Sequence, residues 1–399
     1  MTPSAPLILS ACRTPIGRYL GGLSGFSAIE LGVLAARGAI ERAGIDPGEV
    51  DEAIIGNVLS AGLGQAPARQ VALGSGMPPA SSALTVNMVC GSGLRAVMLA
   101  ATAIRAGDAD LVLAGGMESM SNAPHLLRRG RAGWKLGDRG LVDSMLHDGL
   151  TCAVEGWPMG HAAEHTAEQC GLSRAELDAL ALESQRRAVA AQRAGAFEAE
   201  IVPVPVAFKG KGASGAVALA ADEGPRGDSS AEGLARLAPA FRPDGIVTAG
   251  NSSTLSDGAA MVVVSSEREA GRLGATPIAR ILATAVSGLD PRDLFLAPIG
   301  AVRTALARAG LGPDAIDLYE INEAFASQLL GCVRGLQIDP ARVNVHGGAI
   351  ALGHPIGASG ARVLVTLLHA LQRRQERLGL AALCLGGGNA VAMIVERVA

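Results

Sequence analysis

One order of helix, turn and strand patterns occurs twice along the chain. An Ala-rich amphipathic helix is followed at residues 41–57 (ERAGIDPGEVDEAIIGN), and again at residues 307–322 (ARAGLGPDAIDLYEIN), by an Ala-Gly stop, a turn with proline and an apolar strand. A repeat of this kind indicates that each half of the chain builds its own α/β unit.

A second pair of segments repeats in the same order. Residues 86–104 (VNMVCGSGLRAVMLAATAI) correspond to residues 343–348 (VNVHGG) and then, after an insertion, to residues 357–371 (GASGARVLVTLLHAL). Each copy continues into an apolar strand that ends in glycines, at residues 110–119 and 381–390. Two blocks in one order favour duplication over chance similarity of Ala/Gly-rich strings. The pattern predicts two α/β halves stacked in α-β-α-β-α layers, with buried helices between the sheets.

The stretch between the two copies has no counterpart later in the chain. We expect residues 1–120 and 251–272 to form the N-terminal half, residues 273–399 the C-terminal half, and residues 121–250 a large insertion, or loop domain. A helix is predicted at residues 173–195, because a Ser cap is followed by Glu at the third position. A long insertion on such a scaffold is typically a substrate lid or an oligomer contact.

Composition agrees with a layered α/β protein and excludes some partners. The 399 residues are 49% hydrophobic, which is ample for a large core, while aromatic residues make up only 3% and Gly occurs 53 times. With 34 basic and 37 acidic residues the net charge is −3. No global basic field would therefore hold nucleic acid or an anionic membrane, and a polyanionic ligand must meet a local basic patch.

The six cysteines give no sign of a metal site. They lie far apart with no CxxC or CxxH pair, so we expect free thiols in a reducing compartment and no bound metal. The start, MTPSAPLILSACRTP, lacks the basic and apolar regions of a signal peptide, and the final ERVA is not a peroxisomal address. No uncharged apolar stretch of ~18 residues occurs either. A cytoplasmic protein with no membrane partner is expected.

Cys90 is the first candidate for chemistry. An apolar strand runs into it, glycines permit a sharp turn, and a helix begins one or two residues later. A sulfur near a helix N-terminus meets unpaired N–H groups and a favourable dipole, which favour thiolate over thiol. The alternative is a buried structural cysteine. The glycines around the turn and its place in the repeat favour a nucleophile.

Three further polar groups occur at turns of the second copy. His354 lies between glycines and before Pro355, which keeps it out of mid-helix, and pseudo-symmetry places its turn opposite the Cys90 turn as a base. Cys384 ends a strand at a glycine-rich turn, where it is either a disulfide partner or, as a reducing compartment favours, a second proton-transfer group. Asn322 lies between a strand and a helix, where a helix N-cap would also suit it.

Six motifs together resemble those of one enzyme family. VNMVCGSGLRAV, GGMESMS, TAGNSSTLSDGAA, NEAFA, GGAIALGHPIGASGAR and CLGGG are similar to motifs of the thiolases, in particular the acetyl-CoA acetyltransferase branch. The similarity runs from about Ile8 to the C-terminus. It implies a duplicated thiolase-type fold and chemistry on acyl groups carried by coenzyme A.

The resemblance also implies a role for each polar group. Cys90 would take the acyl group as a thioester, and His354 would activate Cys90. Cys384 would remove a proton from the methyl carbon of a second acetyl-CoA, or return it during cleavage. The His354 ring and a water held by Asn322 would form one oxyanion hole, and the backbone N–H groups of Cys90 and Gly386 the other. Such a reaction needs no metal or redox cofactor.

The family pattern further implies where coenzyme A lies. It places Leu150, Ala249 and Ser253 along the pantetheine, Arg226 and Phe241 towards the nucleotide, and Met159 and Phe325 beside the acyl pocket. A basic cluster in the insertion either attracts phosphates or belongs to a solvated oligomer loop; its members are Arg128, Arg129, Arg131, Lys135 and Arg139. This segment resembles the loop that joins family dimers into tetramers, so a homotetramer is expected in preference to a dimer.

Three local departures from the family pattern bear on the substrate. Pro158 stands where the family often has a histidine that contacts coenzyme A. The run FLAP, from Phe295 to Pro298, replaces a Gly-x-Gly-Pro pattern and adds bulk near the expected acyl pocket. After CLGGG the chain continues with Asn389 and Ala390 instead of Met-Gly or Gln-Gly. Chain-length preference therefore stays open.

The leading hypothesis is an acetyl-CoA C-acetyltransferase, which condenses two acetyl-CoA to acetoacetyl-CoA or catalyses the thiolytic reverse. Within the same class, the alternative is a broader-chain 3-ketoacyl-CoA thiolase of degradation. From another class, the alternative is a non-catalytic thiolase-like protein that binds acyl-CoA. Such a module has no use for two thiols and a base. A decarboxylating ketosynthase would present histidines where this chain has Asn322 and Cys384.

Overall fold

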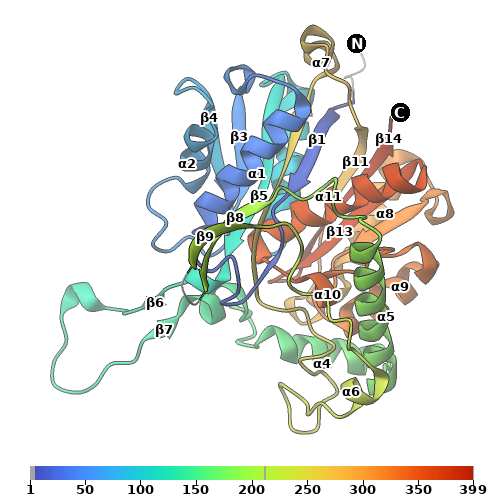
Figure 1. Ribbon diagram of the computed structural model, residues 1–399. Coiled ribbons are helices and arrows are strands. Elements are labelled where there is room, and N and C mark those ends of the chain that lie inside the picture. Colours follow the sequence, from blue (N-terminus) through green and yellow to red (C-terminus); the bar gives the residue numbers. More distant parts are fainter. Residues whose placement is uncertain (1–4, 211–212, 399) are drawn as a thin grey trace.

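The chain folds around a ten-stranded mixed sheet with helices on its outer faces and between its two halves (Figure 1). The computed structural model describes residues 5–210 and 213–398. The sheet order is β12-β13-β14-β11-β1-β10-β5-β3-β4, with the short β2 beside β10. The two halves of this sheet meet where β1 pairs with β11 over only two residue pairs, Leu7 with Arg280 and Ile8 with Ala279.

The N-terminal half places an antiparallel strand among parallel ones. Its strands are β1 (Leu7–Arg13), β2 (Gly17–Arg18), β3 (Glu52–Gly56), β4 (Ser82–Val86), β5 (Leu111–Ser119) and β10 (Ser256–Ser265). Strand β10 runs antiparallel to both β1 and β5, while β3 runs parallel to β4 and β5. Helices α1 (Ala28–Ala43) and α2 (Pro67–Gly74) contact each other, and α1 packs against β1, β5 and β10.

The C-terminal half repeats this order. Its strands are β11 (Ala279–Gly288), β12 (Leu318–Ile321), β13 (Leu378–Leu385) and β14 (Asn389–Arg397), and its helices include α8 (Ala297–Ala309), which packs on β11 and β14, and α9 (Ala326–Leu336). The pair β12–β13 is parallel and β14 is antiparallel to its neighbours, as in the first half. The predicted duplication and fold class are confirmed. The strand predicted over residues 381–390 divides in two, because Gly387 and Gly388 adopt φ of 82° and 91° in a turn between β13 and β14.

Two central helices lie between the half-sheets. Helix α3 (Ser92–Ala106) packs on β3 and β5, and α11 (Ile356–Arg374) contacts strands of both halves as well as α3. Their backbones approach where each has glycine: a Cβ on Gly93 would lie 2.7 Å from Ala361 N, and one on Gly360 would lie 2.3 Å from Leu94 N. Within the described chain one segment, Val89–Ala106, has the length and composition of a membrane span, and it includes this central helix.

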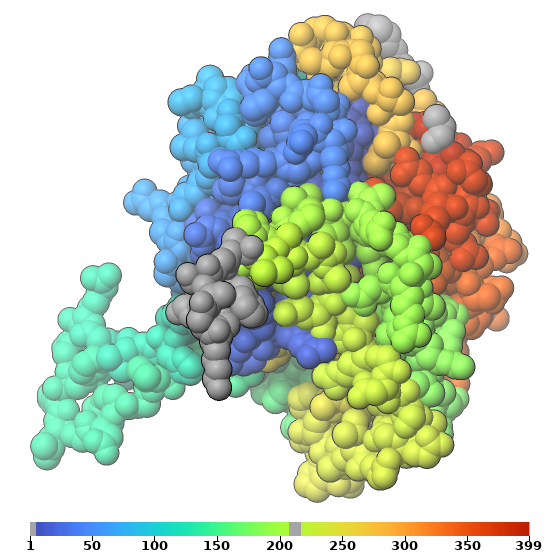
Figure 2. Space-filling view, in the orientation of Figure 1, coloured from blue at the N-terminus to red at the C-terminus, as the bar shows by residue number. Residues whose placement is uncertain are grey.

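The insertion covers one end of the two halves. It contains β6 (His125–Leu126), β7 (Val142–Asp143), α4 (Met159–Gln169), α5 (Arg174–Arg193), β8 (Val204–Gly210), β9 (Ala213–Leu219) and α6 (Ala231–Ala235). The predicted capping box is present, with Ser173 accepting from the N–H of Glu176 at the start of α5. Strands β6 and β7 carry an arm that projects away from the body (Figures 1 and 2).

A buried ion group ties the insertion to the core. Arg13, at the end of β1, is fully buried, and its Nε donates to Glu200 Oε1 over 2.6 Å. Its Nη1 and Nη2 donate to the two oxygens of Asp222 over 2.6 and 2.8 Å. Each charge is paired and hydrogen-bonded, as burial in a low dielectric requires.

Both chain ends lie at the same end of the molecule. Ala279 of β11 pairs with Ile8 of β1 on one side and with Arg397 of β14 on the other. Figure 1 shows the start of β1 and the end of β14 close together, opposite the end that carries α4 and α6.

The contact between α3 and α11 predicts a specific effect of added bulk. Gly360→Ala should lower the free energy of unfolding by about 1–3 kcal/mol, because its Cβ would meet the backbone of α3. The control is Gly271→Ala in α7 (Glu267–Leu273), where nothing lies within 4 Å of the new Cβ. The free energy of unfolding of that variant should rise by about 0.5–1 kcal/mol, since Ala stabilises a helix more than Gly does. Urea denaturation measures both, and equal changes in the two variants would contradict the close contact.

Candidate active site

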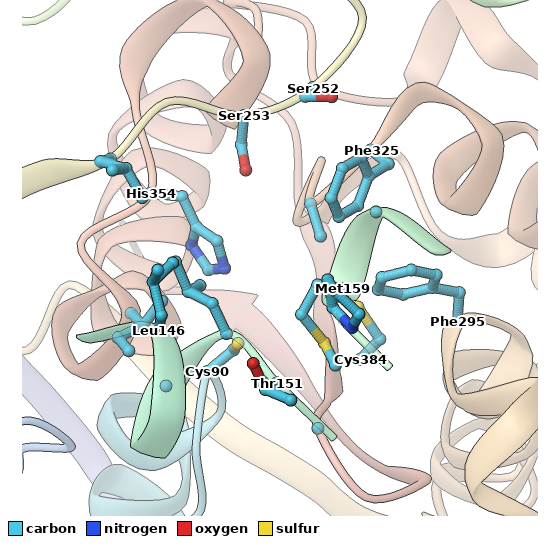
Figure 3. A pocket seen from close by; sticks show the side chains of 18 of the residues that line it. Cys90, Leu146, Thr151, Met159, Ser252, Ser253, Phe295, Phe325, His354 and Cys384 are labelled. Carbon is cyan, nitrogen blue, oxygen red and sulfur yellow. The ribbon is translucent and has the colours of Figure 1, made fainter. Parts of the chain in front are cut away.

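A cavity of about 250 Å³ lies where the two halves and the insertion meet. Cys90 reaches it from the turn between β4 and α3, and His354 from the turn between α10 (Ala349–Leu352) and α11. Cys384, near the end of β13, and Gly386, in the following turn, also line it. Figure 3 shows the Cys90, His354 and Cys384 side chains around one space. The convergence expected from the repeat is therefore present.

The turn before α3 aims the Cys90 sulfur into this cavity. Val89 takes a φ of 47°, and Gly91 takes the N-cap position of α3. Burial raises the pKa of the Cys90 thiol to about 12, although the backbone N–H groups of Cys90 and Gly386 point at the sulfur and lower it. The expected thiolate at rest is wrong, because removal of the sulfur from water outweighs the help of the helix end and the two N–H groups.

His354 is held as a neutral base. Its Nδ1 lies 2.6 Å from Ser359 Oγ, and the Ser359 hydroxyl donates to Pro355 O over 2.9 Å. Because that hydroxyl proton is already used, we assign the imidazole proton to Nδ1, which leaves Nε2 free to accept. Burial, with the charge of Arg362 in support, lowers the pKa of His354 to about 3. The ring is therefore neutral near pH 7 and presents a basic nitrogen.

Cys384 is a free and buried thiol. Burial raises its pKa well above the ordinary value, and the neighbouring Cys90 and Cys332 add to the shift. Neither Cys90 nor Cys384 is part of a disulfide in the structure, so the alternative of a disulfide partner is not realised. A thiolate at Cys384 would be a strong base, because its protein surroundings do little to stabilise the charge.

Asn322 stands directly behind His354. Its Nδ2 lies 3.5 Å from His354 Nε2, and its Oδ1 lies 3.4 Å from Arg362 Nη2. The alternative role as a helix N-cap is wrong, since α9 begins at Ala326 with Phe325 in the cap position. The Asn322 side chain is completely buried and does not itself line the cavity; its link to the site is this approach to His354.

Two buried carboxylates that the sequence analysis did not single out support the site. Glu118, at the end of β5, accepts from the N–H groups of Val58 (3.1 Å), Leu59 (3.3 Å) and Gly357 (3.0 Å), and it thereby ties an N-terminal loop to the start of α11. Burial raises its pKa to about 7. In the sequence, Glu118 is the one charged residue of an otherwise apolar, glycine-containing strand. A charged side chain in a buried strand is unusual, and this could have marked it as a candidate.

The second carboxylate forms a loose ion pair beneath Asn322. Glu320 Oε2 lies 3.6 Å from Arg362 Nη1, and both side chains are almost completely buried. Burial raises the pKa of Glu320 to about 8, despite the opposite charge of Arg362. Arg362 thus faces Asn322 on one side and Glu320 on the other. Ser359 and Arg362 both occur in the motif GASGAR. The contacts of Arg362 depend on the packing of α11 against β12, whereas Ser359 contacts the turn that directly precedes its own helix.

The predicted coenzyme A residues divide into two groups. Five line the cavity: Leu150, Met159, Phe241, Ser253 and Phe325. Arg226 and Ala249 do not line it and are exposed. The backbone N–H of Arg226 donates to Gln185 Oε1 over 2.8 Å. What these seven residues bind stays a prediction.

Two of the three departures from the expected pattern lie on the cavity wall. Pro158 and Phe295 both contribute to the lining, and Phe295 is only 2% exposed. Within residues 5–210 and 213–398 no group of three or more His, Cys, Asp or Glu side chains is arranged to hold a metal ion.

Known proteins resemble the chain over its whole length. Residues 7–268 match the family model described as thiolase, N-terminal domain, and residues 275–397 match thiolase, C-terminal domain. An acetyl-CoA acetyltransferase of Escherichia coli (strain K12) is 53% identical and covers 98% of this chain and 98% of its own. The solved Bacillus anthracis acetyl-CoA acetyltransferase is 39% identical with a TM-score of 0.95, over 100% of both chains. An Ascaris suum thiolase in complex with coenzyme A is 43% identical with a TM-score of 0.92, over 99% of this chain and 100% of that one.

The neutral buried imidazole predicts a pH dependence of stability. The pKa of His354 is about 3 in the folded state against 6.5 for an ordinary histidine, so below pH 6.5 the unfolded chain binds a proton that the folded chain does not. The free energy of unfolding therefore decreases as the pH is lowered, and His354 accounts for a loss of about 2 kcal/mol between pH 7 and pH 5.

The His354→Asn variant isolates this contribution. All other titrating groups are shared, so the variant should lose about 2 kcal/mol less than the unaltered chain over the same interval. Urea denaturation at pH 7 and pH 5 provides the two differences. Identical losses in both proteins would show that His354 is not buried in its neutral form.

Proposed function

Because the chain belongs to the thiolase family, we propose that it is an acetyl-CoA C-acetyltransferase, which condenses two acetyl-CoA to acetoacetyl-CoA and coenzyme A, or catalyses the thiolytic reverse. The observation that carries this proposal is the meeting of two thiols, one imidazole and two aimed backbone N–H groups at a single cavity. A non-catalytic acyl-CoA-binding protein would need none of these groups. Acyl-CoA thioesters and, in the thiolytic direction, free coenzyme A are the only reactants that the chemistry requires, and no metal or redox cofactor takes part.

The first step transfers an acetyl group to Cys90. Both partners are neutral at rest, so the thiol must lose its proton to His354 Nε2 as the sulfur attacks the thioester carbonyl. The tetrahedral oxyanion lies between the N–H groups of Cys90 and Gly386, which already point at the sulfur. The bond from the carbonyl carbon to the coenzyme A sulfur then breaks, and an acetyl-Cys90 thioester remains.

The second step needs Cys384 as a thiolate. The departing coenzyme A sulfur takes the proton of Cys384, while His354 keeps the proton from Cys90 at Nε2. The Cys384 thiolate, whose raised pKa makes it a strong base, removes a proton from the methyl carbon of a second acetyl-CoA. The enolate oxygen accepts from the protonated Nε2 and from a water held by Asn322, whose Nδ2 lies 3.5 Å from that nitrogen.

Bond formation restores the starting state. The enolate carbon attacks the acetyl-Cys90 carbonyl, the Cys90 sulfur leaves, and it takes back the proton from His354. Acetoacetyl-CoA departs with Cys384 again a thiol. The neighbouring charges Arg362 and Glu320 do not touch the substrate, and Arg362 disfavours a resting imidazolium, because it lowers the pKa of His354.

We further propose a cytoplasmic homotetramer. The arm between β6 and β7 leaves large apolar side chains exposed, namely Leu127, Trp134, Leu136 and Leu141. Figure 2 shows this arm standing clear of the body, so that in this view no other described part of the chain covers it. Exposed apolar side chains on an extended arm favour contact with another subunit, and the arm is where the sequence resembles a tetramer-forming loop.

The roles of the two thiols predict separable defects. Cys90→Ala should abolish the acetyl-enzyme that intact-mass measurement detects after incubation with acetyl-CoA, because no other cavity sulfur meets the two N–H groups. Cys384→Ser should still acetylate Cys90 but slow condensation by at least about a hundredfold. Acetylation of Cys90→Ala at another residue, or normal turnover by Cys384→Ser, would refute the assignment.

The arm predicts the oligomeric state. Replacing residues 127–141 by Asn-Gly should close β6 and β7 into a short hairpin and convert a tetramer to a dimer, measured by sedimentation velocity. Acetylation of Cys90 by acetyl-CoA serves as the control for intact folding. An unaltered chain that sediments as a dimer, or a shortened chain that stays tetrameric, would contradict the proposal.

A further inference from the structure

Phe295 closes the inner end of the cavity. At the mouth Leu146 and Phe241 are 51% and 36% exposed, whereas Leu294, Phe295 and Cys384 at the other end are no more than 2% exposed. Figure 3 shows the Phe295 ring on the far side of Met159 and Cys384 from Cys90 and His354. A substrate that enters from the mouth therefore meets this ring last.

Contacts to the Phe295 backbone and to its ring hold this side chain in place. Phe295 lies in a short 3-10 helix, Pro291–Leu296, whose N-cap Asp290 accepts from the N–H of Arg292. Its carbonyl accepts from the Cys332 thiol over 3.2 Å, which anchors the segment to α9. Its ring centroid lies 5.4 Å from that of Phe325 at an interplanar angle of 56°. A side chain held in this way acts as a wall and not as a movable gate.

The Phe295 side of the cavity is where the acyl chain of a bound substrate would extend. With the carbonyl oxygen between the Cys90 and Gly386 N–H groups, the pantetheine arm must occupy the mouth, and the alkyl part must run past Cys384 to the inner end. Where a glycine would leave that end open, the Phe295 ring fills it. An acetyl group has a single methyl to place, but a butyryl group must place two more carbons against the ring.

We propose that Phe295 determines acyl-chain length, by limiting the group transferred to Cys90 to short chains. The proposal rests on the thiolase function argued above and names its substrate class. It predicts that acetoacetyl-CoA, which leaves acetyl on Cys90, is preferred to 3-ketohexanoyl-CoA, which leaves butyryl. A preference of tenfold or more is expected, since misplacing one or two methylene groups costs roughly that much in specificity.

The test compares three variants with the unaltered chain. The ratio of kcat/KM for thiolysis of 3-ketohexanoyl-CoA to that of acetoacetyl-CoA should rise roughly tenfold or more in Phe295→Ala. Phe295→Leu, a smaller change that is easier to accommodate, should give a rise of about threefold. The control is Leu177→Ala, which loses a side chain buried in the same apolar cluster but not on the cavity wall. Its ratio should stay within about twofold of the unaltered chain, because loosened packing alone does not lengthen the pocket.

A second readout does not depend on turnover. Intact-mass measurement after incubation with butyryl-CoA should show little butyryl-Cys90 in the unaltered chain and clear acylation in Phe295→Ala. Equal use of both 3-ketoacyl substrates by the unaltered chain, or an unchanged ratio in both Phe295 variants, would overturn the inference while leaving the thiolase function intact. Failure of the unaltered chain to cleave either substrate or to form acetyl-Cys90 would instead overturn the function itself, and the inference with it.

Discussion

The site depends on how closely two helices can approach. Glycines at Gly93 and Gly360 let the backbones of α3 and α11 touch, with no room for even a methyl group between them. Each helix begins next to a polar group: Cys90 precedes α3 and His354 precedes α11. Because the two helix starts are held by direct backbone contact, the proposed nucleophile and base are placed by the rigid core of the protein and not by flexible loops.

The same burial decides the charge state of the resting site. Cys90, His354 and Cys384 are all kept neutral, since the centre of a five-layer protein offers little solvation for an ion. In the proposed mechanism, charge appears only while protons move between the three groups and the substrate, and it appears where N–H groups already point. A resting ion pair between thiolate and imidazolium would need surroundings more polar than these.

Sequence patterns predicted the duplication and the meeting of the Cys90, His354 and Cys384 turns, because both depend on local order: a turn after a strand repeats its position when the fold repeats. The predicted thiolate at Cys90 was wrong. The helix end favours a thiolate, but the loss of water around the sulfur outweighs it, and that loss depends on the folded surroundings. Glu118 and Arg362 escaped notice because their partners lie on other elements. Ser359 was overlooked although its partners, His354 and Pro355, directly precede its own helix. Arg226 and Ala249 lie off the cavity wall, and no local pattern could show how far the enclosed part of the site extends.

Both ends of the chain lie beside β11, away from the insertion and its α4 and α6 helices (Figure 1). A carrier domain, affinity tag or second enzyme fused at either end would therefore lie away from α4, whose residues Met159 and Gly160 line the cavity. The same proximity would allow the start of β1 and the end of β14 to be joined by a short linker and new ends to be opened at a surface loop. The duplicated scaffold is thus well suited to tethered cascades, in which a product thioester passes directly to the next catalyst.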